Sequence, residues 1–307
     1  MRALARSATL DDGYLLSNSF RQQRTIACRE SVEGYGSWSG QDVRLEFRPA
    51  PPNRGIVFVR ADLKPPHEVP ARVENRFDMP RRTSLMTGSV TVEMIEHVMA
   101  ALAGLQIDNC EVWVDGAEMP GCDGSSLPFV TALDAAGLVE QDAVRPKLVV
   151  DQVLRVGDDH CWVEARPAEA ADLSLHCRID YGPSGPIGRQ AFAIEVTPQS
   201  FRTELAPART FLLEREAVWL RSQGLGTRVT TREVLVFGPQ GPLDNTLRFE
   251  DECVRHKTLD MVGDLALAGC DLVGHFTVYC GGHRLNAELV RTLLARRQLV
   301  TGLRKTA

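Results

Sequence analysis

The stretch HKTLDMVGD, residues 256–264, lies in a segment that we predict to be a helix over residues 250–268. Helical geometry brings residues four apart onto one face, so His256, Asp260 and Asp264 stand there one turn apart. A histidine and a carboxylate at this spacing can share a cation, although such pairs also occur on salt-bridged surface helices. The stretch therefore predicts a helix that carries either a metal site or a charged surface.

A second polar pair, Glu96-His97, lies in an otherwise apolar helix predicted over residues 92–105. Burying two adjacent polar side chains is costly unless something satisfies them. Because adjacent helical residues point about 100° apart, His97 can bind a metal while Glu96 faces the water at that metal. Together with His256 and Asp260, His97 completes three N/O ligands, the number common in catalytic zinc sites. A Glu–His pair satisfied at the edge of the core is the alternative.

A third candidate is His283, which follows a predicted strand and the pair Gly281-Gly282 and opens a predicted helix. A helix N-terminus disfavours a positively charged imidazole. A nearby carboxylate such as Asp264 is therefore needed to hold His283 protonated as an acid. A capping or surface role for His283 is the alternative.

The two halves of the chain show a similar coarse order of predicted strands and helices, on either side of a polar segment at residues 140–147. Strands and helices are segregated in each half, which predicts an α+β fold rather than a doubly wound parallel sheet. Because 307 residues fit two domains of roughly 100–200 residues each, we expect domains at residues 18–141 and 147–300, with a linker around Pro146. Strands are predicted near residues 24–28, 43–47, 56–59, 112–114, 148–150, 161–164, 173–177 and 191–194, and helices over residues 92–105, 127–138, 214–222, 250–268 and 284–296.

Composition narrows the class of protein. Hydrophobic residues make up 44% and charged residues 24%, which is typical of a globular chain and excludes disorder as its main state. The formal charge of −5 lacks the basic excess of a nucleic-acid-binding surface, so no nucleic-acid partner is expected. The sequence has no apolar stretch suited to a secretory signal or a transmembrane helix. Eight cysteines without a Cys-x-x-Cys motif favour a reduced, cytoplasmic protein.

Longer motifs surround the candidate residues in both halves. In the first half they are IEH (95–97), AALAGLQIDN (100–109), EMP (118–120) and DGSSLPF (123–129). In the second half they are ARTF (208–211), LRFEDE (247–252), HKTLDMVGDL (256–265), and GHF through GGHRLN (274–286). In this order they resemble the UDP-3-O-acyl-N-acetylglucosamine deacetylase family, the zinc amidases of lipid A biosynthesis. The similarity extends from about residue 22 to the last predicted helix.

The resemblance implies a fold and an activity. The fold is two similar α+β domains, each a sheet with helices packed on it, with the active site between the helix layers. The activity is that of a zinc-dependent amidohydrolase that removes the acetyl group of UDP-3-O-acyl-N-acetylglucosamine and releases acetate. The implied partner is therefore a small acylated UDP-amino sugar. We further expect a monomer with peripheral contact to the inner membrane and no transmembrane segment.

The resemblance also implies a role for each matching residue. The implied zinc ligands are His97, His256 and Asp260. The other implied roles are Glu96 as general base, His283 as catalytic histidine, Asp264 as its orienting carboxylate, Thr210 as a hydroxyl near the oxyanion and Lys257 as a basic group near the substrate's polar head. In this chemistry zinc polarises the acetamide carbonyl and acidifies water, whose proton passes to Glu96. His283 stabilises the oxyanion or protonates the leaving amine.

Three segments depart from the family pattern. Ser37-Trp38 stands where the family has Leu-His, Leu212-Leu213 replaces Gly-Phe, and residues 226–237 lack the usual Asn-Ala pattern. These segments surround the expected acyl passage, for which Phe211, Leu212 and Leu213 are the expected substrate contacts. We therefore expect an acyl-chain preference that differs from that of typical members.

Two other functions stay open at this point. One is a paralogue that binds zinc and an acylated sugar without catalysis, and the other is a deacetylase for a different acylated amino sugar. Glu96 and His283 favour an active enzyme, because neither is needed to hold zinc and both are needed to hydrolyse an amide.

Overall fold

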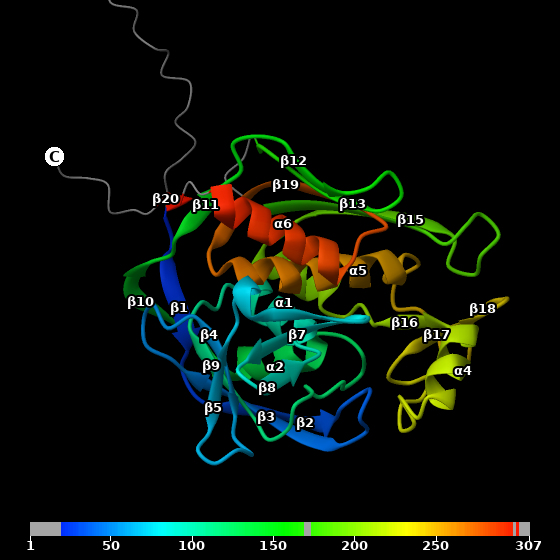
Figure 1. Cartoon of the computed structure of the whole chain (residues 1–307), viewed down its shortest axis with the longest axis horizontal. Coiled ribbons are helices and arrows are strands. Elements are labelled where there is room, and N and C mark those ends of the chain that lie inside the picture. Colours follow the sequence, from blue (N-terminus) through cyan, green and yellow to red (C-terminus); the bar gives the residue numbers. More distant parts are fainter. Residues whose placement is uncertain (1–19, 169–172, 297–298, 301–307) are drawn as a thin grey trace, which may run out of the picture.

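The computed structural model describes residues 20–168, 173–296 and 299–300 of the 307-residue chain. Two sheets form its outer layers, and the main helices lie between them (Figure 1). Helix α1 (Glu96–Gly104) from the first half packs against α5 (Glu252–Leu265) from the second. The predicted α+β fold, with sheets covered by helices and the helix layers facing each other, is confirmed.

The first half contains a five-stranded sheet with the strand order β2-β3-β9-β4-β5. In β3 (Asp42–Pro49), the alternating residues Val43, Leu45 and Phe47 are buried, as expected for a strand with one face on the core. A three-stranded sheet β6-β7-β8 and the pair β1-β10 complete this half. The remaining bounds are β1 (Gln22–Ile26), β2 (Glu30–Tyr35), β4 (Ile56–Arg60), β5 (His67–Pro70), a 3₁₀ turn (Val73–Asn75), β6 (Arg76–Met79), β7 (Arg82–Thr87), β8 (Val90–Glu93), β9 (Cys110–Val114), α2 (Leu127–Ala136) and β10 (Leu138–Val144).

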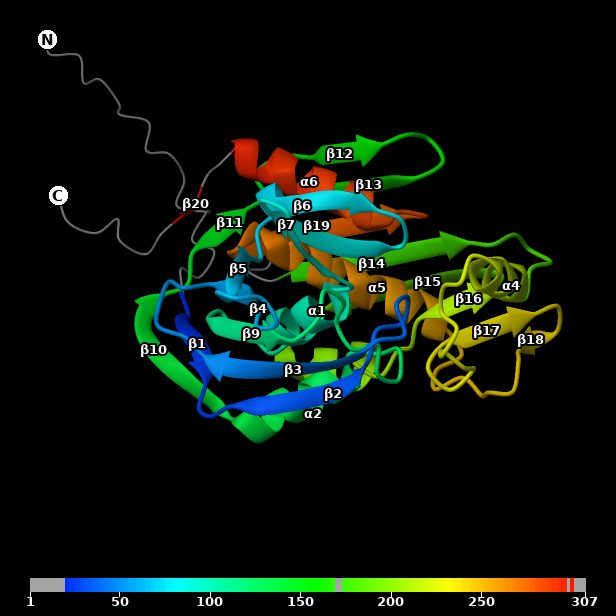
Figure 2. The same ribbon diagram turned by 60° about the horizontal axis from the view of Figure 1, so that its bottom comes forward.

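The second half is built on β19 (Asp271–Tyr279), which pairs with β13, β11 and β14 in one seven-stranded sheet. Helix α6 (His283–Arg296) lies against β12 and β13 of this sheet. A small sheet, β16-β17-β18, and α4 project at one end of the molecule (Figure 2). The remaining bounds are β11 (Lys147–Val149), β12 (Leu154–Gly157), β13 (Trp162–Arg166), β14 (Leu173–Asp180), β15 (Arg189–Glu195), α3 (Pro198–Ser200), a π-helical turn (Phe201–Leu205), β16 (Phe211–Leu213), α4 (Glu214–Ser222), β17 (Leu235–Gly238), β18 (Gly241–Pro242), a 3₁₀ turn (Ala266–Ala268) and β20 (Leu299–Val300).

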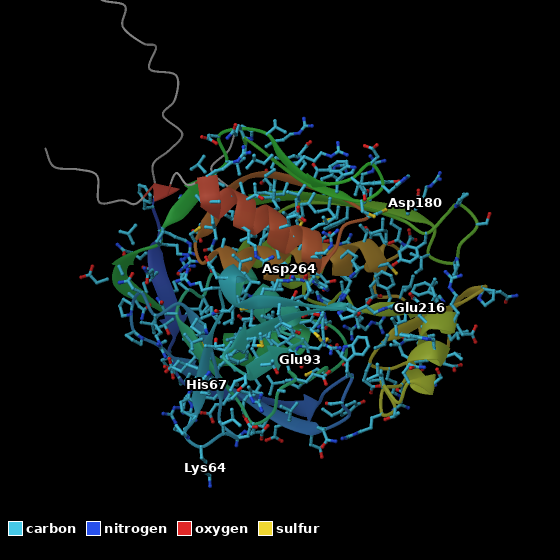
Figure 3. The ribbon with its side chains drawn as sticks, in the orientation of Figure 1. Lys64, His67, Glu93, Asp180, Glu216 and Asp264 are labelled. Atoms are coloured by element: carbon cyan, nitrogen blue, oxygen red, sulfur yellow. The ribbon has the colours of Figure 1, made fainter. Side chains whose placement is uncertain are left out.

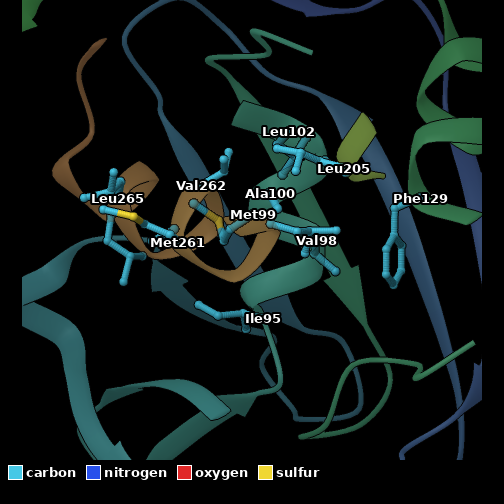
Figure 4. Packing of buried hydrophobic residues seen from close by; sticks show 14 of the residues in the cluster. Ile95, Val98, Met99, Ala100, Leu102, Phe129, Leu205, Met261, Val262 and Leu265 are labelled. Atoms are coloured by element: carbon cyan, nitrogen blue, oxygen red, sulfur yellow. The ribbon is translucent and has the colours of Figure 1, made fainter. Parts of the chain in front are cut away.

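The contact between α1 and α5 brings the two halves together. Ile95, Met99 and Leu102 on or next to α1 are buried in the cluster that also holds Val262 of α5 (Figure 4). Gly263 makes the approach close, because a Cβ at this position would lie 2.1 Å from the carbonyl oxygen of Glu96. A glycine is therefore required where α5 crosses the first turn of α1.

Three predicted boundaries need correction. The helix predicted over residues 92–105 begins at Glu96, because the residues before it form β8, and Met94 has a left-handed φ of 60°. The helix predicted over residues 127–138 ends at Ala136. The linker predicted at residues 140–147 was mostly wrong, because β10 continues to Val144 in antiparallel pairing with β1, and β11 begins at Lys147.

Only two residues therefore separate β10 from β11. In the described chain, the strands of any one sheet come either all before this junction in the sequence or all after it. The bounds of two domains at residues 18–141 and 147–300 stay a prediction, and residues 18–19 and 297–298 lie outside the described part. Among the helices that the structure describes, none is both long and apolar enough to cross a membrane.

Candidate metal centre and active site

Two histidines and one aspartate converge where α1 meets α5. His97 comes from the first turn of α1, and His256 and Asp260 come from one face of α5. The Oδ1 atom of Asp260 lies 3.6 Å from Nε2 of His97 and 3.4 Å from Nε2 of His256. Their ligand atoms all lie within 4.8 Å of one another, and all three residues are buried. The arrangement can hold a metal ion.

The hydrogen bonds of these residues fit a metal site. The buried Oδ1 of Asp260 has no hydrogen-bond partner, which is costly unless a cation satisfies it. Nδ1 of His256 bonds with the carbonyl oxygen of Ala208 at 3.1 Å, which leaves Nε2 for a metal. Burial lowers the pKa of His256 to about 3 and so keeps the imidazole neutral, the form that ligates. Two imidazole nitrogens and a carboxylate form a donor set suited to zinc.

Lys257 contacts the other oxygen of Asp260. Its Nζ donates a hydrogen bond to Asp260 Oδ2 at 2.7 Å. Burial acts to raise the pKa of Asp260, but the positive charge of Lys257 beside it helps to hold that pKa well below its usual range. Asp260 is therefore ionised, as a metal-binding carboxylate must be.

Glu96 lies beside this group as a buried carboxylate. The backbone N–H of Thr83 in β7 donates to Glu96 Oε2 at 3.0 Å, while Oε1 lies 4.0 Å from Nε2 of His283. Burial raises the pKa of Glu96. A carboxylate with a raised pKa can accept and pass on a proton near neutral pH.

His283 stands at the start of α6 and pairs with Asp264 of α5. Its Nδ1 lies 2.8 Å from Asp264 Oδ2, which also accepts a hydrogen bond from Nδ2 of Asn286 at 2.8 Å. Burial acts to lower the pKa of His283, but the charge of Asp264 and its hydrogen bond outweigh this effect and raise the pKa to about 9. The structure therefore brings the two residues together, and their catalytic roles stay a prediction. Figure 3 shows Asp264 in the middle of the molecule.

Sequence reasoning missed two residues that hold Asp264. The hydroxyl of Thr83 donates to Asp264 Oδ1, and Asn286 donates to Oδ2. Thr83 belongs to the first half and Asp264 to the second, 181 positions later in the sequence. No local pattern connects residues so far apart, although Asn286 follows His283 by three residues and was within reach of a helical-face argument.

A cleft of about 840 Å³ runs over the metal-site residues. Of the sequence-predicted site residues, it is lined by Glu96, His97, Thr210, Phe211, Leu212, His256, Lys257, Asp260 and His283. Asp264 is buried against His283, outside the lining. Leu213 packs against the hydrophobic core and also lies outside the lining.

One side of the cleft is apolar. The ring of Phe211 lies 6.3 Å from the ring of His256 and 6.4 Å from that of Phe237. Leu212 continues this wall. The other apolar lining residues on this side are Leu220, Leu225, Val229, Val234 and Val236. The cleft therefore combines a polar floor with a wall suited to an aliphatic chain.

Two of the segments that depart from the family pattern meet at the edge of the cleft. The backbone N–H of Gly226 donates to the carbonyl oxygen of Trp38 at 3.3 Å, and both residues line the cleft. Arg228 donates to the carbonyl oxygen of Gly40 and to Asp42, each at 2.7 Å. We call these contacts between residues 38–42 and 226–228 the rim contact. It joins the two halves at the edge of the cleft.

Comparison with known proteins agrees with this geometry. The sequence profile of the family described as UDP-3-O-acyl N-acetylglycosamine deacetylase matches residues 23–295. A protein of Myxococcus xanthus named UDP-3-O-acyl-N-acetylglucosamine deacetylase is 40% identical over 279 residues, covering 89% of this chain and 86% of that protein. Proteins of the same name from Anaeromyxobacter sp. and Brucella ovis are 39% and 38% identical and cover 90% and 89% of this chain, and 90% and 95% of their own lengths. The chain therefore belongs to the UDP-3-O-acyl N-acetylglycosamine deacetylase family of hydrolases.

Proposed function

We propose that this chain is a zinc-dependent N-deacetylase that hydrolyses the acetamide of UDP-3-O-acyl-N-acetylglucosamine and releases acetate in lipid A biosynthesis. The observation that carries the proposal is the meeting of a three-ligand group, a buried carboxylate and a charged histidine in one cleft. Family membership and the names of the relatives support the same reaction.

His97, His256 and Asp260 are the residues that would hold zinc. The unpartnered Oδ1 of Asp260 and the neutral imidazole of His256 support this assignment. When bound, zinc supplies a Lewis acid that polarises the acetamide carbonyl and makes water easier to deprotonate. Hydrolysis also needs a base and an acid on either side of the reacting carbon.

Glu96 and His283 fit these two roles. Glu96 accepts the proton of the attacking water at its carboxylate, and the hydrogen bond from Thr83 fixes Oε2 while Oε1 stays available. His283 is protonated by its pairing with Asp264 and can donate from Nε2 to the leaving amine. The separation of 4.0 Å between His283 Nε2 and Glu96 Oε1 leaves both groups within reach of one reacting centre.

The remaining residues of the cleft bind and position the substrate in this proposal. Thr210 places a hydroxyl near the developing oxyanion, and Lys257 presents its ammonium group toward the substrate's polar head. Phe211 and Leu212 contact the acyl chain. Leu213 supports this wall from the core side rather than by contact, since it lies outside the lining.

We further propose that the protein acts in the cytoplasm as a monomer and contacts the inner membrane only peripherally. The composition and the cysteine usage described above support the cytoplasmic location. A substrate that carries an acyl chain explains the expected contact with a membrane surface.

The deciding experiment follows acetate release from UDP-3-O-acyl-N-acetylglucosamine by the zinc-loaded protein. We expect release that stops when the metal is removed by a chelator and returns when zinc is added. Glu96→Gln should lose activity, whereas Glu93→Gln, three residues earlier and outside the cleft lining, should retain it. Tight substrate binding without acetate release would instead establish the non-catalytic paralogue.

A further inference from the structure

Glu118, the first residue of the EMP motif, connects two segments that border the cleft. Its carboxylate accepts hydrogen bonds from two consecutive backbone N–H groups, that of Trp38 at Oε1 (2.7 Å) and that of Ser39 at Oε2 (2.8 Å). Its main chain forms a parallel bridge with Glu93, the last residue of β8. Because Glu118 is buried, it ties the loop at residues 37–39 firmly to the strand that leads into α1.

The backbone of this loop fits closely around the carboxylate of Glu118. A Cβ at Gly36 would lie 2.3 Å from Oε2 of Glu118, so a glycine is required for this approach. Hydrogen bonds from backbone N–H groups to a carboxylate are charge-assisted and about twice as strong as neutral ones. Glu118 therefore fixes the backbone from which the side chain of Trp38 extends.

The indole of Trp38 contacts the turn between β8 and α1. Its Nε1 donates a hydrogen bond to Sδ of Met94 at 3.1 Å. The guanidinium group of Arg82 lies over its ring, 4.8 Å from the centroid. Trp38 and Met94 are both half-buried and both line the cleft. Trp38 thus has one partner on its ring face and another on its N–H group.

Met94 occupies a backbone conformation that is costly for a residue with a side chain. Its φ is 60°, in the left-handed region, where the Cβ approaches the carbonyl oxygen. A residue in this region persists only when its surroundings hold it there. The next residue, Ile95, is held by its backbone N–H, which donates to the carbonyl oxygen of Thr83 at 3.2 Å. The hydrogen bond from Trp38 acts on the side chain of Met94 itself.

The turn at Met94 sets the direction in which α1 begins. Ile95 is the N-cap of this helix, and Glu96, two residues after Met94, is its first residue. Oε1 of Glu96 lies 4.0 Å from Nε2 of His283, so a change in the first turn of α1 alters the distance between the proposed base and the proposed acid. A misplacement of about 1 Å can cost roughly 100-fold in turnover.

We propose that Glu118 and Trp38 are positioning residues of this site. Glu118 fixes the loop that carries Trp38, and Trp38 holds Met94 in the left-handed turn. The turn in turn aims Glu96 at the reacting carbon. This inference rests on the proposed function, in which Glu96 is the base. It gives a role to the EMP motif and to Trp38, one of the residues that depart from the family pattern.

Two substitutions at Met94 separate a positioning role from simple packing. Met94→Leu keeps a side chain of similar size in the left-handed turn but removes the sulfur acceptor. Met94→Gly removes the strain, because glycine adopts a φ of 60° without a steric cost. With the zinc-loaded, full-length protein and UDP-3-O-acyl-N-acetylglucosamine, kcat should fall roughly threefold to tenfold in Met94→Leu, the scale of one neutral hydrogen bond, with little change in KM. In Met94→Gly, kcat should stay close to that of the unsubstituted protein. Packing alone predicts the opposite order, since glycine leaves the larger cavity.

Trp38→Phe removes the indole N–H group and keeps an aromatic ring. It should lower kcat as Met94→Leu does, and the two substitutions together should lower kcat no further, because both remove the same hydrogen bond. Glu118→Gln should also lower kcat, since the uncharged amide is a weaker acceptor for the two backbone N–H groups. The matched control is Trp113→Phe on β9, where the indole N–H donates to Glu111, and it should retain kcat.

A measurement without substrate follows the indole N–H groups directly. In the ¹⁵N-labelled, zinc-loaded protein, the Nε1–H of Trp38 should exchange with solvent more slowly than that of the exposed Trp219. Met94→Leu should shift the Trp38 signal and speed its exchange while leaving the Trp113 signal unchanged.

The proposal is overturned if Met94→Gly loses as much kcat as Met94→Leu, or if the effects of Trp38→Phe and Met94→Leu on kcat multiply. It is also overturned if Met94→Leu leaves the exchange of the Trp38 indole unchanged. Absent acetate release from the unsubstituted protein would instead show that the proposed function is wrong, while the indole signal still decides whether Trp38 holds Met94.

Discussion

Thr83 donates its hydroxyl to Asp264 across the boundary between the two halves, and its backbone N–H donates to Glu96 at 3.0 Å. One residue of β7 thus contacts both the proposed base and the carboxylate behind the proposed acid. Because Thr83 is buried, these hydrogen bonds are made in a region of low dielectric, where they fix the two carboxylates firmly.

The first prediction concerns the metal ligands. His97→Ala and His256→Ala should each lose stoichiometric zinc, because the site falls from three protein ligands to two. Metal analysis of protein whose fold is verified by circular dichroism measures this loss. The exposed His160→Ala is the matched control and should keep its zinc. Binding at the original affinity in both ligand variants would show that the assignment is wrong.

The second prediction separates metal binding from chemistry. Glu96→Ala and His283→Ala should each lower kcat by roughly 10²–10⁴ while zinc stays bound, the usual scale for losing a positioned base or acid. Steady-state kinetics together with metal analysis measure both quantities on the same samples. Full turnover in Glu96→Ala would eliminate this residue as the base.

The third prediction tests the positioning role of Thr83. Thr83→Val removes the hydroxyl at nearly constant size and leaves the N–H bond to Glu96, so kcat should fall by roughly tenfold or more with little change in KM. Thr83→Ser should restore most of the loss. Thr87→Val on the same strand is the matched control, since the buried hydroxyl of Thr87 has no hydrogen-bond partner. An equal fall in kcat in Thr83→Val and Thr87→Val would show that the effect comes from general destabilisation of β7.

The fourth prediction concerns the protonation of His283. In the metal-free protein, NMR titration should find its pKa near 9, and Asp264→Asn should lower it, since Asp264 raises it more than any other group does. The pKa of His283 in the folded protein lies above the usual histidine value of about 6.5. The pairing with Asp264 therefore contributes its full stabilisation of the fold below about pH 6.5. This stabilisation is lost as the pH rises through about 9. A wild-type pKa at the ordinary histidine value would contradict the pairing.

The fifth prediction concerns the acyl chain. Each buried methylene contributes about 0.8 kcal/mol, so shortening the chain by several carbons should lower kcat/KM by orders of magnitude. Arg228→Ala should change the preferred chain length, because it removes two hydrogen bonds of the rim contact beside the apolar wall. Kinetics with a series of acyl lengths measure both effects. Equal kcat/KM for acylated and non-acylated UDP-N-acetylglucosamine would point to a general sugar N-deacetylase.

The parts of the site that were predictable from sequence lie on single helices. His256 and Asp260 share a face of α5 by spacing alone, and His97 was conspicuous as a polar residue in an apolar helix. Thr83 could not be found this way, because its role depends on the packing of β7 against a helix 181 positions away. Local periodicity carries no information about such a contact.

The errors in the fold have similarly local causes. The apolar residue Val92 fits a helical stripe as well as a strand, and only the pairing of β8 with β7 decides between them. The polar residues of β10 suggested a linker, since three of its seven residues are Glu140, Gln141 and Asp142 and none of the seven is buried. Its pairing with β1 is set by partners far away in the sequence.

The crossing of α5 over α1 ties the dimensions of the metal centre to a residue that has no side chain. A methyl group at Gly263 would collide with the carbonyl of Glu96, the residue before His97, and the helices would have to separate. Any side chain at position 263 would therefore change the distance of His97 from His256 and Asp260. Gly263 contributes no ligand atom, yet it determines how closely the helices that carry the three ligand residues approach each other.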